Sequence, residues 1–104
     1  MSADPYEVLR TAERVADRLR MLGPRWAARD HAADAAPVAA VRHALQRLAD
    51  AGANAAGELR RPVPDIGLHA LADQVLVLTR DALAGGGAAV DGAGSALDDL
   101  RAAL

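Results

Sequence analysis

The chain has 104 residues, a net charge of −2 and 52% hydrophobic residues, a composition typical of one soluble globular domain. It contains no cysteine, which excludes disulfides, thiolate nucleophiles and Cys-based metal sites. No apolar run approaches the ~20 residues that span a bilayer, and the first residues lack the pattern of a secretory signal. We therefore expect a cytoplasmic protein with a single domain over residues 1–104.

Half of the hydrophobic residues are alanine, and large aromatic side chains are rare. The hydrophobic residues include 27 alanines, 14 leucines and 8 valines, but one Trp, one Tyr and no Phe. Alanine favours helix but buries little area. The core should therefore be modest, and additional burial against a second copy or another helical protein is expected.

The first expected helix covers residues 4–22. Asp4 is a typical N-cap, Pro5 suits the first helical position, and Glu7 follows the cap by three residues. Gly23-Pro24 is expected to end the helix. One face carries apolar residues at alternating spacings of four and three: Val8, Ala12, Val15, Leu19 and Leu22.

Two further helices are expected at 37–58 and 66–84, while Pro24 could open a short helix in 24–36. Residues 60–64 should be extended because residues that precede proline avoid the helical region. Asp65 can cap the helix over 66–84, whose apolar arc spans about 160° and should touch two neighbours. The helix over 37–58 has its own apolar stripe: Val38, Val41, Leu45, Leu48, Gly52 and Ala55.

The tail, residues 88–104, has two interpretations. Its apolar stripe favours one long helix, whereas Gly92 and Gly94 each cost about 1 kcal/mol in a helix interior, so that Ser95 could cap a shorter one. The triplet 85–87 is a helix stop or hinge. The sequence thus predicts an all-α, up-and-down bundle of three or four helices, in which 88–104 packs on the core, forms an interface or is a mobile tail.

Two polar groups could suggest chemistry. His69, Asp73 and Arg80 share one side of a helix, but no nucleophile joins them, so a solvated stripe is the favoured interpretation. The possible metal ligands lack a recognised ligand spacing: Asp30, His31, Asp34 and His43. We predict no catalytic residue, no metal and no cofactor, and hence no enzyme.

Several apolar residues are candidates for an interface. Trp26 could plug the end of the bundle or act as a binding hot spot, and the plug is favoured. Val77 lies on the otherwise polar side of its helix. The tail stripe supplies the remaining candidates, which are Val90, Leu97, Leu100 and Leu104.

Arg10, Arg14 and Arg18 form a basic stripe along the first helix. Neighbouring acids can pair with them, and a pI near 5.8 is unlike that of a nucleic-acid binder. An acidic partner, or the acidic C-terminal half of the chain itself, is the favoured counterpart. The predicted function is a non-enzymatic protein–protein interaction module that self-associates or docks on a helical protein. The alternative is a small regulatory protein that binds nucleic acid or an anionic ligand through the arginine stripe.

Overall fold

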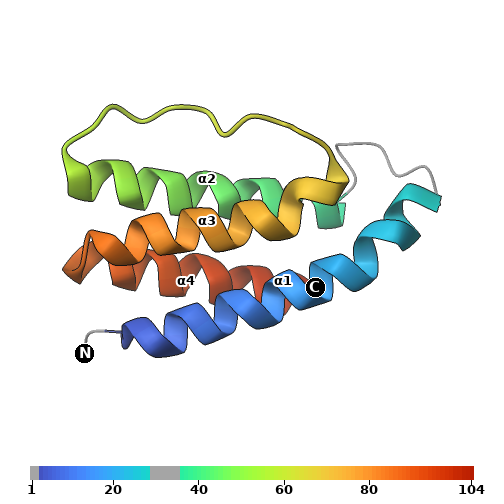
Figure 1. Ribbon diagram of the computed structural model, residues 1–104, viewed down its shortest axis with the longest axis horizontal. Coiled ribbons are helices and arrows are strands. Elements are labelled where there is room, and N and C mark those ends of the chain that lie inside the picture. Colours follow the sequence, from blue (N-terminus) through green and yellow to red (C-terminus); the bar gives the residue numbers. More distant parts are fainter. Residues whose placement is uncertain (1–2, 29–35) are drawn as a thin grey trace.

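A computed structural model describes residues 3–28 and 36–104, and it confirms an all-α helical bundle (Figure 1). A single 3-10 turn, η1 (Leu68–Ala70), leads into the third helix. The described residues form four α-helices: α1 (Pro5–Ala28), α2 (Ala36–Ala56), α3 (Leu71–Ala84) and α4 (Gly87–Ala103).

The four helices run in two opposite directions, with two helices in each. α1 and α4 point one way, and α2 and α3 point the other way (Figure 1). α3 packs against both α1 and α2, which confirms the prediction of two neighbours, and α4 also packs against α1 and α2. α1 and α2 occupy opposite corners and make no contact in the described part of the chain. The bundle therefore has two antiparallel seams, α1/α3 and α2/α4, and two parallel seams, α2/α3 and α1/α4.

The parallel α2/α3 seam depends on residues 57–67, here called the strap. Helices that follow one another in the same direction need a connection that returns along the bundle, and Figure 1 shows the strap doing so. Eleven extended residues reach about 36 Å, which exceeds the ~31 Å length of a 21-residue helix such as α2. The prolines of the strap favour this extended backbone.

Side-chain amides fix the strap to both helices beneath it. Gln46 of α2 donates to the carbonyl of Arg61 (3.0 Å) and accepts from the amide of Val63 (3.0 Å). Gln74 of α3 donates to the carbonyl of Pro64 (3.1 Å). Gln46 thus supplies a donor and an acceptor to the strap, as a neighbouring strand would.

The first helix is longer than expected. Gly23-Pro24 does not end it, and α1 continues to Ala28 and bends beyond the bundle in Figure 1. A proline removes one N–H donor, but burial of Trp26, which is 6% exposed, stabilises the extra turn. The expected stop and the separate short helix opened by Pro24 are therefore wrong. Trp26 belongs to the core, which agrees with the plug interpretation. It is therefore not part of an exposed binding surface.

The third helix begins later than expected. Gly67 has φ = 100°, a conformation that interrupts a helix, and Ile66 lies exposed before it. The Asp65 carboxylate accepts a hydrogen bond from the Gly67 amide (3.0 Å), in a turn and not at the predicted helix cap. The α-helical part starts at Leu71.

The tail forms one helix that belongs to the core. Gly92 and Gly94 lie where α4 approaches its neighbours: an added Cβ would be 3.6 Å from Ala51 and 3.3 Å from Val8. Burial offsets the low helix propensity of these glycines. The prediction of a tail interface is wrong for Val90, Leu97 and Leu100, which are at most 3% exposed within this single chain, while Leu104 is half-buried. In the 85–87 triplet, Gly85 and Gly86 separate α3 from α4, and Gly87 is the first residue of α4.

Candidate interaction surface

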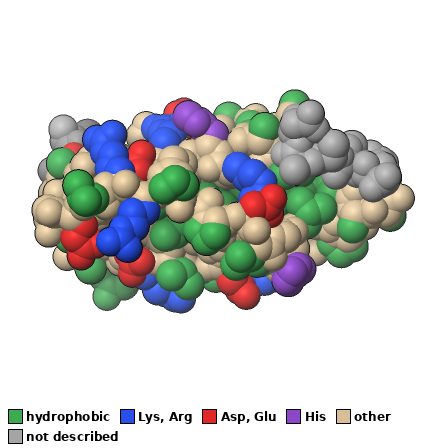
Figure 2. Space-filling view, turned by 90° about the horizontal axis from the view of Figure 1, so that it is seen from above, with side chains coloured by type: hydrophobic (Ala, Val, Ile, Leu, Met, Phe, Trp, Pro, Cys, Tyr) green, Lys and Arg blue, Asp and Glu red, His purple; other side chains and the backbone are tan. Residues whose placement is uncertain are grey.

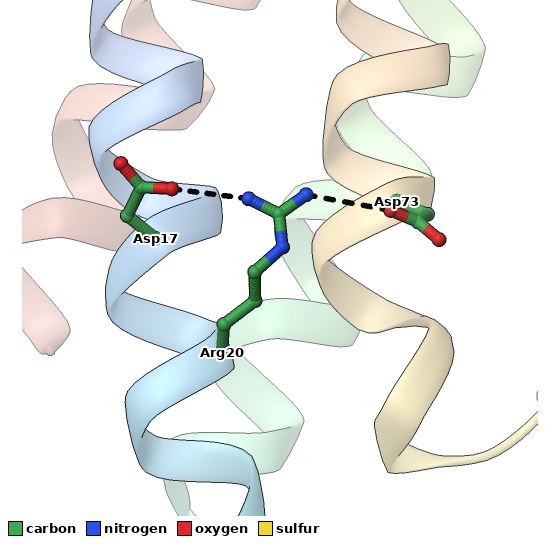
Figure 3. A network of polar contacts seen from close by, with 3 residues as sticks. All are labelled: Asp17, Arg20 and Asp73. Carbon is green, nitrogen blue, oxygen red and sulfur yellow. Dashed lines mark hydrogen bonds and ion pairs between the residues drawn. The ribbon is translucent and has the colours of Figure 1, made fainter.

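The histidine-centred groups do not assemble a polar site. The Asp73 carboxylate is paired with Arg20 of α1 (3.5 Å), which also contacts Asp17 (3.0 Å), as Figure 3 shows. His69 lies exposed on η1 at the edge of a mainly apolar hollow of about 340 Å³ between α1 and α3. Arg80 is exposed and has no ion-pair partner among the described residues.

The predicted set of possible metal ligands is only partly described. His43 is exposed on α2, and Asp30, His31 and Asp34 lie outside the described residues. Within residues 3–28 and 36–104, no three His, Asp or Glu side chains come together in an arrangement that could hold a metal ion.

Both antiparallel seams carry an ion pair between helices. Arg20 meets Asp73 across α1/α3, and Arg47 of α2 meets Asp99 of α4 at 2.8 Å and Ser95 at 3.1 Å. A third pair joins Arg42 of α2 to Asp65 of the strap at 2.7 Å. All three link an arginine of the N-terminal half to an aspartate of the C-terminal half, but none involves Arg10, Arg14 or Arg18, the arginines for which that counterpart was predicted. Seen from above, basic and acidic side chains are interspersed (Figure 2).

The predicted basic stripe is different. Arg10, Arg14 and Arg18 form no ion pair with any described residue. Arg14 and Arg18 line a hollow between α1 and α4 together with Arg101, Val15 and Leu104. Its volume of about 250 Å³ is below the usual size of small-molecule pockets. Arg10 does not line it. Arg101 cannot be assigned to the stripe from the sequence, since only the packing of α4 beside α1 brings this residue to it.

A second hollow lies along the same two helices, and it is acidic. Three of its lining residues come from the first turns of α1: Asp4, Glu7 and Thr11. Asp91, Ser95 and Asp98 of α4 face them. The Asp4 carboxylate accepts a hydrogen bond from the Tyr6 amide (2.9 Å), which confirms the predicted N-cap, and Asp91 accepts one from the Ala3 amide (2.7 Å).

Together the two hollows form one surface, which we call the α1/α4 groove. Its residues recur at spacings of three and four along each helix, so each set stays on one side. Among the groove residues of each helix the acids come first and the arginines last, an order that the helix dipole favours. Because α1 and α4 are parallel, the two acidic ends lie side by side, and so do the two basic ends. The groove therefore has an acidic end and a basic end. Its polar lining residues are the N-cap Asp4 with Glu7, Thr11, Arg14 and Arg18 of α1, and Asp91, Ser95, Asp98, Asp99 and Arg101 of α4, of which Asp99 is paired with Arg47 of α2.

Val77 is the one candidate from the sequence that remains an exposed aliphatic, with 55% of its surface accessible.

Comparison of the chain with protein-family models, with curated proteins and with solved structures gave no match in any of the three. Among the described helices, none is both long and apolar enough to cross a membrane.

Proposed function

We propose that this protein is a non-enzymatic protein–protein interaction module and that the α1/α4 groove is its docking surface. One observation carries the proposal: parallel packing of α1 and α4 aligns like charges that have no compensating partner across that seam. Charged groups arranged in this way select a partner of complementary pattern and speed its association. The predicted cytoplasmic location, which rests on the sequence, is part of the same proposal.

Site-specific photocrosslinking in the native cell tests this function. A crosslinking amino acid at Thr11, in the middle of the groove, is expected to capture a protein partner. The same group at Arg80, which does not line the groove, is the control. Capture at Thr11 should fall when Arg14→Glu and Arg18→Glu are added, because reversed charges repel a complementary surface. Equal capture from both positions, or none from Thr11, would contradict the proposal.

A second candidate function is binding of a small anionic ligand at the basic end. The observation in its favour is that Arg101 joins Arg14 and Arg18 around one hollow. A long nucleic acid fits the groove less well, because it would meet the acidic end as well. Calorimetry with inorganic phosphate and with a short single-stranded oligonucleotide, on the wild type and on Arg101→Glu, tests this function. Binding that weakens with salt and is lost in the variant would support it.

A further inference from the structure

We infer that the occupant of the α1/α4 groove is a second copy of the chain, bound antiparallel about a two-fold axis. This inference rests on the proposed function and names its partner. In such a dimer the acidic end of one groove lies over the basic end of the other, so the three arginines of each basic end face acids of the other copy. An isologous interface requires this kind of self-complementary surface.

The positions of the charges agree with a single axis. On α1, Glu7 and Arg14 lie symmetrically about residues 10–11, and Asp4 and Arg18 about residue 11. On α4, Asp91 and Arg101 lie symmetrically about residue 96, whereas Asp98 is mirrored onto Gly94 and has no arginine opposite it. The midpoints lie close together in the monomer. Thr11, at the α1 midpoint, and Ser95, next to the α4 midpoint, line the same hollow. One axis perpendicular to the helices can therefore serve both.

The axis also fixes which helices meet. A two-fold axis that lies in the plane of the groove, across the helices, places α1 over the α1 of the second copy and α4 over its α4. Each pair is antiparallel, so the helix dipoles oppose one another across the interface as well. Glu7 of one copy then meets Arg14 of the other, twice per dimer. A two-fold axis along the helices would instead bring like charges together, which costs free energy.

The groove is polar and exposed, so the dimer should be weak and sensitive to salt. Exposed ion pairs contribute little each, which gives an expected dimer Kd on the order of 10–100 µM at low ionic strength. Sedimentation equilibrium on the full chain measures this value. Raising the salt concentration from about 0.05 to 0.5 M should weaken the dimer about tenfold, because exposed charges are screened.

Charge exchange within the Glu7–Arg14 pair tests the geometry. Glu7→Arg and Arg14→Glu each create two repulsive contacts per dimer, and each should raise the Kd at least about tenfold. The double variant restores both contacts and should dimerise like the wild type. Equimolar mixing of the two single variants should give a heterodimer, since each pair then unites opposite charges. Arg80→Glu, which changes the net charge by as much as Arg14→Glu but lies outside the groove, is the control for net charge.

The double variant also separates this inference from the proposed function. A foreign partner would meet the exchanged charges as mismatches, so the double variant would bind it no better than the single variants do. A monomeric wild type up to about 1 mM, or a double variant that stays monomeric, overturns the second-copy inference. If the Thr11 crosslink still captures another protein, the proposed function stands without self-association. If neither the crosslink nor the dimer is found, both fail. Circular dichroism confirms that each variant is folded.

Discussion

The antiparallel seams and the parallel α1/α4 seam carry charge in opposite ways. Across α1/α3 and α2/α4, an arginine of one helix meets an aspartate of the next, as in Arg20–Asp73 and Arg47–Asp99. Along α1/α4, acids lie beside acids and arginines beside arginines. On α1 and α4 the acids of the groove precede its arginines, so parallel packing of these two helices places like charges side by side. The charged side chains of the α1/α4 seam therefore remain available for a partner.

The largest effect is expected at the other parallel seam, α2/α3, where hydrogen bonds of Gln46 and Gln74 join the strap to the two helices. Gln46→Ala removes three hydrogen bonds of the Gln46 amide and leaves the strap backbone without its partners. We expect a loss of about 1–3 kcal/mol in the free energy of unfolding. Urea denaturation measures it. Gln74→Ala, which removes one bond to the strap, is the matched control and should cost less. Equal losses would show that Gln46 has no special role there.

An intermediate effect is expected when one arginine is truncated on each kind of seam. Arg47→Ala removes an ion pair and a hydrogen bond of a side chain that is 33% exposed, and it should cost about 0.5–1 kcal/mol. Arg14→Ala should change stability by less than about 0.5 kcal/mol, since it breaks no ion pair with the described residues. Thermal melts at low protein concentration compare the two monomers. The contrast between the seams is wrong if Arg14→Ala proves the more damaging change.

An effect of similar size but opposite sign is expected on the two flanks of α4. Gly92→Ala places a Cβ at an ordinary contact distance of 3.6 Å from Ala51 of α2, so the gain in helix propensity should stabilise the fold by about 0.5–1 kcal/mol. Gly94→Ala meets Val8 of α1 at 3.3 Å, and the crowding should offset most of that gain. Chemical denaturation of both variants would reveal whether α4 packs more tightly against α1, across the parallel seam, than against α2. A larger gain for Gly94→Ala would contradict this order.

The fold class followed from local patterns. The cap at Asp4, the stripe on α2 and the wide arc on α3 each predicted an element, because capping and apolar spacing act within one helix. The wrong boundaries have tertiary causes: burial of Trp26 carries α1 past Pro24, and the backbone at Gly67 delays α3.

The candidate surface was predicted only in part. The arginine stripe was visible in the sequence, because its residues share one helix. The acidic end and Arg101 were not, since they become neighbours only when α4 packs parallel to α1. That arrangement depends on the course of the strap, which no local pattern specifies. The tail stripe was misassigned for the same reason: apolar spacing predicts that a face is buried but not what buries it.

The diagonal placement of sequential helices has a consequence for cooperativity. α1 and α2, the helices of the N-terminal half, make no contact with each other in the described part of the chain. α3 and α4 contact each other less than either contacts α1 or α2. Neither half can therefore bury its own apolar stripes, and each completes its core only with helices from the other. Folding should be all-or-none, without a stable half-folded intermediate, and a chain cleaved within the strap should hold its structure only while both fragments stay together.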